Sequence, residues 1–251
     1  MSTWIWAFLG TGFTFLMTTL GAAVVFLFRG EINPQIQKVL LGFAAGVMMA
    51  ASVWSLLLPA IEAASKEGTA GWIPAAGGVM IGAAGLFWMD AWMTRKKIGG
   101  QTELLIVAVT LHNIPEGMAV GLAFALAAQQ DSRPALYAAA FALAVGIGIQ
   151  NLPEGAAVAL PLRQAGWSAP KAFLTGTLSG MVEPVFGVGV TLAAKKIESY
   201  MPWLLSFAAG AMLYVVIEEL IPEANRGESK VGTAGVMAGF LIMMVLDVAL
   251  G

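Results

Sequence analysis

Two short stretches with the same polar pattern lie inside apolar sequence, HNIPEG at residues 112–117 and QNLPEG at residues 150–155. Within each stretch the polar side chains stand three and four residues apart, which places them on one face of a helix. An imidazole with carboxylate and amide oxygens suits a divalent ion such as Zn²⁺, and Fe²⁺ and Mn²⁺ are also compatible. The pattern therefore predicts a metal site on two helices, with the candidate ligands His112, Asn113, Glu116, Gln150, Asn151 and Glu154.

The composition places these helices in a membrane. Of the 251 residues, 59% are hydrophobic and 11% are charged, whereas about a quarter of a soluble domain is charged. Apolar runs of roughly 20 residues, long enough to span a bilayer, recur along the chain. The start, MSTWIWAFLG, lacks the basic region of a signal peptide and is expected to be a retained helix. The absence of cysteine excludes disulfides, thiolate metal sites and cysteine nucleophiles, and no basic patch suggests nucleic acid as a partner.

Charged and turn residues divide the chain into eight predicted spans, at about 4–28, 36–63, 72–94, 102–128, 134–162, 169–194, 202–223 and 232–250. We therefore expect an all-α integral membrane protein that forms a single transmembrane domain over residues 1–251. Its eight helices are expected in a 3+2+3 arrangement. Helices one to three cover about 4–94, helices four and five, with the metal site, about 102–162, and helices six to eight about 169–250.

The distribution of basic residues predicts the orientation. One set of alternate loops holds nine of the thirteen Lys and Arg residues, namely Arg29, Lys38, Arg95, Lys96, Lys97, Arg163, Lys171, Arg226 and Lys230. The other side holds Lys66, Arg133, Lys195 and Lys196. The richer side is expected in the cytoplasm, so both termini are expected outside.

The chain also repeats itself. FAAGVM at 43–48 resembles FAAGAM at 207–212, and residues 78–90 match 235–247 without a gap, ending on Asp90 and Asp247. Spans two and three then correspond to spans seven and eight. An offset of five spans inverts one copy relative to the other, which is typical of transporters with a site at mid-membrane. Chance similarity among small-residue helices is the alternative.

Prolines and a third glutamate complete the predicted site. Pro115 and Pro153 are expected to kink helices four and five and to free the carbonyls four residues earlier. Lipid tolerates such a group only where a cavity or a ligand satisfies it. In span six, Glu183 also precedes a proline, in MVEPVFG.

The charge balance indicates what fills the site. An ionised glutamate near the bilayer centre costs about 2.5–3.5 kcal/mol, and every Lys and Arg lies in or beside a predicted loop. Glu116, Glu154 and Glu183 are therefore either protonated or neutralised by an ion from outside. His112, the chain's only histidine, favours a metal ion over a proton. A structural histidine and a proton-binding glutamate remain alternatives.

At these residues the sequence resembles the ZIP (Zrt/Irt-like) family of divalent-metal transporters, in its bacterial GufA-like branch. The resemblance rests on the eight spans, the external termini and the paired HNxPEG-type motifs. It implies transport of a divalent metal, Zn²⁺ first and then Fe²⁺, Mn²⁺ or Cd²⁺, across a bacterial inner membrane into the cytoplasm. It also implies a homodimer, an elevator-like movement of spans one, four, five and six against the rest, and a metal that is substrate rather than cofactor.

The same resemblance implies two metal ions bridged by Glu116 and Glu154. The first ion would also bind His112 and Gln150, and the second would also bind Asn113, Asn151 and Glu183. Many members have a histidine at the position of Gln150, and some have an aspartate at that of Asn151, so this centre is less basic and less negative. Residues 94–103, TRKKIGGQTE, lack histidine, so no cytosolic metal-sensing loop is expected.

Two other functions remain open. A histidine with carboxylates can activate water, as in an intramembrane metalloenzyme, although the chain has no HExxH pair. Acidic rings can also form a cation or proton channel, which would not need His112.

Acidic residues near the span ends give a further hypothesis, that they collect metal outside and receive it inside. These residues are Glu62 at the outer end and Glu218, Glu219 and Glu223 at the inner end. Solvated helix ends explain them equally well.

Overall fold

The computed structural model describes the backbone of residues 2–27, 33–66, 68–96, 101–129, 134–196, 198–227 and 229–250. It describes their side chains except those of residues 93, 94, 96, 101–105, 108, 112, 164, 195, 198 and 250. All regular structure in this part is helical, as expected. The longer helices are α1 (Thr3–Ala23), α2 (Pro34–Ala51), α4 (Trp72–Lys96), α5 (Gln101–Gln129), α6 (Pro134–Gln164), α7 (Ala169–Gly180), α8 (Val182–Ala193), α9 (Met201–Val215) and α11 (Val231–Leu250). Shorter pieces are α3 (Leu58–Lys66) and α10 (Ile221–Ala224), the 3₁₀ turns Val24–Phe26, Ala194–Lys196 and Glu198–Tyr200, and the π-helical segments Ser52–Leu57 and Val216–Leu220.

The chain is a multi-pass helical membrane protein. Within the described residues, seven continuous helical stretches are long and apolar enough to cross a bilayer: Thr3–Phe26, Pro34–Lys66, Trp72–Trp92, Pro134–Arg163, Ala169–Ala193, Met201–Ala224 and Val231–Ala249. Each coincides with a predicted span to within a few residues. The remaining predicted span, 102–128, falls on α5, whose first five side chains lie outside the description. The count of eight spans therefore stays a prediction.

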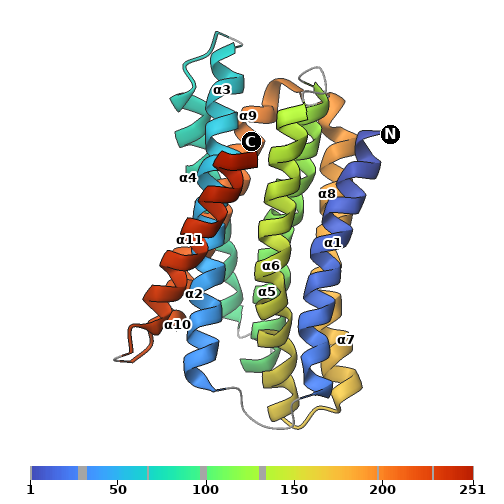
Figure 1. The fold of residues 1–251 in the computed structure, drawn as a ribbon, viewed down its shortest axis with the longest axis vertical. Coiled ribbons are helices and arrows are strands. Elements are labelled where there is room, and N and C mark those ends of the chain that lie inside the picture. The colour runs from blue at the N-terminus through green and yellow to red at the C-terminus, as the bar shows by residue number, and fades with distance from the viewer. Residues whose placement is uncertain are drawn as a thin grey trace.

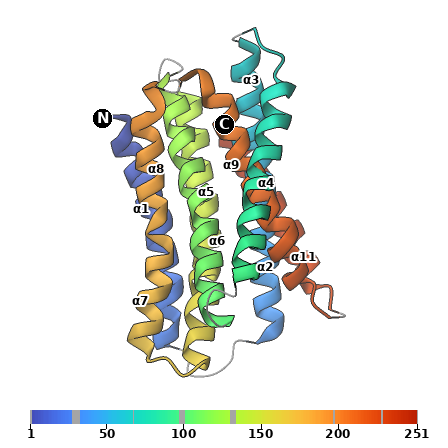
Figure 2. The ribbon, with the colours of Figure 1, turned by 180° about the vertical axis from the view of Figure 1, so that it is seen from behind.

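The helices form two blocks that lie side by side (Figures 1 and 2). The block that contains both PEG sequences, here called the motif block, consists of α1, α5, α6, α7 and α8. The flanking block consists of α2, α3, α4, α9, α10 and α11. Both chain ends lie at the same end of the bundle (Figure 1).

Within each block, glycines bring helix backbones into direct contact. In the motif block Gly155 lies against the carbonyl of Thr18, and Gly117 lies against the carbonyl of Glu183. The flanking block is packed in the same way, with Gly46 on the carbonyl of Val236, Gly210 on that of Val79, Gly82 on that of Phe207 and Gly239 on that of Phe43. A Cβ at any of these positions would collide with backbone atoms. Small residues at such interfaces are how membrane helices gain van der Waals contact.

The contact between the two blocks is of a different kind. Among the described side chains, every hydrogen bond between spans joins helices of the same block. One buried apolar cluster joins the blocks and includes Met48, Leu56, Leu143, Leu205 and Met243. At this boundary Gly146 faces side-chain atoms, Sδ of Met243 and Cγ1 of Val47, rather than backbone. The buried contact described between the two blocks is therefore made by apolar side chains.

Prolines interrupt three spans. The π-helical segments Ser52–Leu57 and Val216–Leu220 end two residues before Pro59 and Pro222. Helix α7 ends at Gly180, four residues before Pro184. Proline has no N–H and its ring clashes with the carbonyl four residues earlier, so the regular hydrogen bond is lost at that turn. A π-helical turn is one way for the helix to continue past such a gap.

The predicted kinks in helices four and five are not confirmed. Pro115 lies inside α5 and Pro153 lies inside α6, and each helix is continuous across its proline. Each proline precedes by two residues a glycine, Gly117 or Gly155, that is clamped against a neighbouring backbone. The close backbone contact thus lies within one turn of each proline.

The glycine contacts predict a sharp difference between alanine substitutions. We expect Gly46→Ala and Gly210→Ala each to reduce the stability of the fold by about 1–3 kcal/mol, because the added methyl group meets backbone atoms that cannot rotate away. Gly85→Ala is the matched control, since a Cβ there has no neighbour within 4 Å, and alanine favours a helix over glycine. Thermal unfolding in detergent measures the effect, and equal melting temperatures for the three variants would contradict this account of the packing.

Candidate metal centre

Three helices bring the predicted ligands together in the motif block. Asn113 and Glu116 come from α5, Gln150 and Asn151 from α6, and Glu183 from the first turn of α8. All five side chains are completely buried. Glu154, one turn after Gln150 on α6, is partly buried. His112 lies in α5 one turn before Glu116, but its side chain is outside the described residues.

The amide groups of the site donate hydrogen bonds to its acids and to a backbone carbonyl. Gln150 Nε2 donates to Glu116 Oε1 at 2.5 Å, and Asn151 Nδ2 lies 3.0 Å from both carboxylate oxygens of Glu183. Asn113 Nδ2 donates to the carbonyl of Ser179, in α7, at 2.9 Å. Glu154 and Glu183 are also close enough to Glu116 to interact with it electrostatically. The structure thus places the two motifs and the span-six acid in one polar cluster.

Oxygen atoms of the same side chains lack hydrogen-bond partners in the described part of the chain. Asn113 Oδ1, Glu116 Oε2, Gln150 Oε1 and Asn151 Oδ1 are buried and have no hydrogen-bond partner among the described residues. A buried polar atom without a partner costs about 1–3 kcal/mol. Because the unpartnered atoms are acceptors in every case, the group that satisfies them must be a donor or a cation. The cluster is therefore suited to binding a positively charged ion through oxygen.

Carboxylates alone do not complete such a site. Within the described side chains no three His, Cys, Asp or Glu residues converge closely enough to hold a metal ion. The amide oxygens of Asn113, Gln150 and Asn151 lie in the same cluster and are without hydrogen-bond partners among the described residues. His112 supplies the one possible imidazole by its position in the sequence.

Helix α1 also lines the cluster, which the sequence analysis missed. Thr18 Oγ1 donates to Glu183 Oε1 at 3.3 Å, and Asn151 Nδ2 lies 3.4 Å from the carbonyl oxygen of Thr14. Thr11, Thr14 and Thr18 are all completely buried. Their spacing of three and four residues marks one helix face, and a polar face on an apolar helix was the signal available in the sequence.

The acids at the span ends do not join the cluster. Glu62 forms an ion pair with Lys66 at 2.7 Å, and Glu223 forms one with Arg226 at 3.5 Å. In both pairs the partners lie on the same short stretch of chain and are largely exposed, as solvated helix ends are. The hypothesis that these acids, with Glu218 and Glu219, relay the metal stays a prediction.

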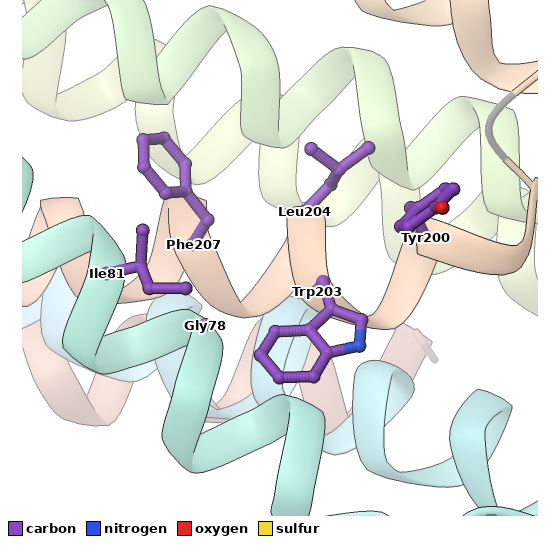
Figure 3. A pocket seen from close by; sticks show the side chains of 6 residues that line it. All are labelled: Gly78, Ile81, Tyr200, Trp203, Leu204 and Phe207. Atoms are coloured by element: carbon purple, nitrogen blue, oxygen red, sulfur yellow. The ribbon is translucent and has the colours of Figure 1, made fainter.

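A separate cavity of about 330 Å³ lies between α4 and α9 (Figure 3). Its lining is Gly78, Ile81, Tyr200, Trp203, Leu204 and Phe207. These residues offer no carboxylate, amide or imidazole, so this cavity is not a second metal centre.

Comparison with known proteins identifies the family. Residues 97–247 match the family model described as ZIP zinc transporter. The chain is 39% identical to the zinc transporter GufA of Myxococcus xanthus, over 93% of this chain and 94% of the relative. It is 38% identical to the zinc transporter ZIPB of Bordetella bronchiseptica, over 98% of this chain and 82% of the relative. It is also 38% identical to the human zinc transporter ZIP11, over 98% of this chain and 97% of the relative.

These relatives are named as transporters and not as enzymes, so the metalloenzyme alternative is set aside. The match includes both PEG motifs and Glu183, the residues that form the buried oxygen-rich cluster. The chain belongs to the ZIP zinc transporter family.

Proposed function

We propose that this protein moves divalent transition-metal ions, Zn²⁺ first, across the bacterial inner membrane into the cytoplasm. One observation carries the proposal: the buried amides of the two motifs donate their N–H groups to Glu116, to Glu183 and to the carbonyl of Ser179, and the cluster leaves acceptor oxygens without partners among the described residues. A bound cation would satisfy these unpartnered oxygens. The names of the relatives make zinc the first candidate.

The charges of the cluster support a divalent ion over a structural role. Neither Glu116 nor Glu183 forms an ion pair with a Lys or Arg in the described part of the chain, although both are completely buried. An ion that arrives from outside supplies the missing positive charge. Oxygen-rich sites also accept Mn²⁺ and Fe²⁺, so we propose that transport is not limited to zinc.

Two ions are proposed for the centre, bridged by Glu116 and Glu154. The first ion is assigned His112 and Gln150 in addition, and the second is assigned Asn113, Asn151 and Glu183. The hydrogen bonds support this division, because Gln150 contacts Glu116 whereas Asn151 contacts Glu183. The two amides therefore belong to different ends of one continuous cluster.

Eight spans in a 3+2+3 arrangement with inverted repeats are proposed as the architecture, and the helix contacts support the repeat. Gly46 and Gly210 occupy the same place in the two FAAG sequences. Gly46 lies on the carbonyl of Val236 and Gly210 on that of Val79, and these valines also correspond in the second repeated segment. The aspartates that end that segment each contact a hydroxyl of the facing span, Asp90 that of Tyr214 at 3.4 Å and Asp247 that of Ser55 at 2.6 Å.

The boundary between the blocks supports a sliding movement of the motif block. Hydrogen bonds and backbone contacts stay within the blocks in the described residues, whereas apolar side chains join them. A displacement along such a boundary exchanges apolar contacts for other apolar contacts and breaks no side-chain hydrogen bond. We propose that the motif block carries its ions past the flanking block in this way, and that the protein is a homodimer, as the resemblance implies.

The orientation is proposed from the basic residues. Nine of the thirteen Lys and Arg residues lie in or beside the first, third, fifth and seventh predicted loops. The described helices that flank these loops have the corresponding ends on the side of the bundle opposite the termini (Figure 1). The positive-inside rule places that end in the cytoplasm and both termini outside. Import then moves ions from the side of the termini to the other side.

Uptake into proteoliposomes tests the proposed function. We expect wild-type protein to take up Zn²⁺, and Glu116→Ala combined with Glu154→Ala to reduce uptake to the level of protein-free vesicles, because both bridging carboxylates are lost. Glu62→Gln, assayed at saturating metal so that collection at the surface is not limiting, is the control for removal of an exposed acid. A wild-type protein that is folded and yet transports none of Zn²⁺, Fe²⁺, Mn²⁺ or Cd²⁺ would refute the proposal.

Substitution at Gln150 tests the role of the amide in metal preference. Gln150→His replaces an oxygen ligand by an imidazole, and nitrogen ligands suit Zn²⁺ better than Mn²⁺. We expect the ratio of Zn²⁺ to Mn²⁺ uptake to rise in competition assays. Gln150→Ala is the control, because it also removes the hydrogen bond to Glu116 without adding a ligand. A ratio that changes equally in both variants would show that Gln150 does not set the preference.

Cross-linking tests the movement, and the natural lack of cysteine makes it direct. Cysteines at Val47 and Gly146 would bridge the two blocks, since a Cβ at Gly146 lies 3.6 Å from Cγ1 of Val47. We expect oxidation to stop uptake and reductant to restore it. Cysteines at Ser55 and Asp247, which contact each other within the flanking block, are the control and should leave uptake insensitive to oxidation. Full uptake by the oxidised Val47–Gly146 pair would exclude sliding at this boundary.

A further inference from the structure

The hydroxyl of Thr18 lies between its own helix and a carboxylate of another helix. Many Ser and Thr hydroxyls in the described helices instead donate to the carbonyl four residues earlier at 2.7–2.9 Å, as in Thr11, Ser52, Thr191 and Ser206. Ser55, which donates to Asp247 Oδ1 at 2.6 Å, is another hydroxyl that contacts a carboxylate in a neighbouring helix. Thr18 Oγ1 lies 3.3 Å from the corresponding carbonyl, that of Thr14, and equally 3.3 Å from Glu183 Oε1. The hydroxyl is thus within reach of the local backbone carbonyl and of a carboxylate in another helix.

Packing on two sides fixes Thr18 in this place. The carbonyl of Thr18 lies against Gly155 of the second motif, and its Cβ and Cγ2 atoms lie against Gly180 at the end of α7. A Cβ at Gly155 would collide with the Thr18 carbonyl, and one at Gly180 would lie only 3.0 Å from the Thr18 side chain. The hydroxyl therefore has a defined position relative to both Asn151 and Glu183.

The packing also relates Thr18 to Glu183. Gly117 of the first motif lies against the carbonyl of Glu183, just as Gly155 of the second motif lies against the carbonyl of Thr18. The two residues thus have the same position relative to the two copies of the PEG sequence. The position beside Gly117 holds the acid Glu183, and the position beside Gly155 holds Thr18, whose hydroxyl contacts that acid. Helix α1 therefore contributes to the cluster through Thr18.

The hydroxyl of Thr18 contacts only one of the two carboxylate oxygens of Glu183. Asn151 Nδ2 is 3.0 Å from both carboxylate oxygens, so it does not distinguish between them. Thr18 contacts Oε1 and thereby makes the two oxygens inequivalent. The Thr14 side chain is also within hydrogen-bonding reach of Glu183, and its hydroxyl in addition donates to the carbonyl of Thr11 at 2.9 Å.

We propose that Thr18 is a positioning residue for the second ion: its hydroxyl holds Glu183 Oε1 and thereby orients the carboxylate toward the ion. The inference rests on the proposed two-ion centre, in which Glu183 binds the second ion only. Outer-shell hydrogen bonds of this kind typically change metal affinity by about 10–100-fold. Thr18 is expected to act within that range on the second ion and to leave the first unaffected.

Calorimetric titration of the purified protein with Zn²⁺ alone tests the proposal. We expect wild-type protein to bind two ions, Thr18→Val to weaken the second binding event about 10–100-fold, and Thr18→Ser to restore it, because serine keeps the hydroxyl. Thr19→Val is the matched control: Thr19 is the next residue, and its hydroxyl donates only to the carbonyl of Phe15 at 2.9 Å. Thr18→Ala removes the hydroxyl without the isosteric methyl group and replaces Thr18→Val if that variant does not fold.

A double substitution separates positioning from a general packing effect. If Thr18 acts through Glu183, Thr18→Val changes nothing further in the Glu183→Gln background, because interacting residues are not additive. Equal weakening in both backgrounds, or an unchanged second event in Thr18→Val, overturns the proposal. The titration needs no transport. Wild-type protein that binds two ions but fails to take them up would therefore refute the proposed function and not the role of Thr18.

Discussion

The constraint on which this structure depends is the presence of three carboxylates inside the spans of a membrane protein whose Lys and Arg residues all lie in or beside the predicted loops. Each ionised group costs about 2.5–3.5 kcal/mol at the bilayer centre. The described contacts offset part of this cost with amide N–H groups, Gln150 on Glu116 and Asn151 on Glu183. Because a primary amide that donates through nitrogen presents its oxygen elsewhere, the side chains that stabilise the acids also leave oxygens for an ion. The same amide side chains thus stabilise the buried acids when no ion is bound and offer oxygen atoms to an ion.

The need to bring these side chains within hydrogen-bonding distance explains the glycines of the PEG motifs. Gly117 and Gly155 let the backbones of α8 and α1 approach α5 and α6, at the residues whose side chains enter the cluster. Polar contacts are then concentrated inside the motif block. The flanking block is closed by its own glycine contacts and by two aspartate–hydroxyl hydrogen bonds. What remains between the blocks is apolar, so the boundary follows from how each block satisfies its own polar groups.

The sequence predicts the spans well, because length and apolar composition are local properties that the bilayer itself requires. The paired motifs predict which polar residues meet, since the same spacing on two apolar helices has few explanations. Thr18 could not be found in this way, because its contact with Glu183 spans 165 residues and buried threonines more often bond their own helix, as Thr11 does. The prolines show a similar limit. Pro59, Pro184 and Pro222 follow interrupted turns while Pro115 and Pro153 do not, although the local chemistry is the same. The local sequence around a proline therefore does not determine whether its helix is interrupted.

The pairing of a hydroxyl with an acid at equivalent positions also bears on release. In the proposed two-ion centre, ionised Glu116, Glu154 and Glu183 would carry three negative charges, and two divalent ions would bring four positive ones. A fourth acid in place of Thr18 would balance the full load, and a balanced pair of ions in a low-dielectric site would leave slowly, since charge attraction is strongest where water is excluded. With a threonine there, the proposed doubly loaded centre would be positive by one charge, and the second ion would be held less tightly than the first. A carrier must give up its cargo on the far side, and a centre that is complete in ligands but short of one negative charge favours that step.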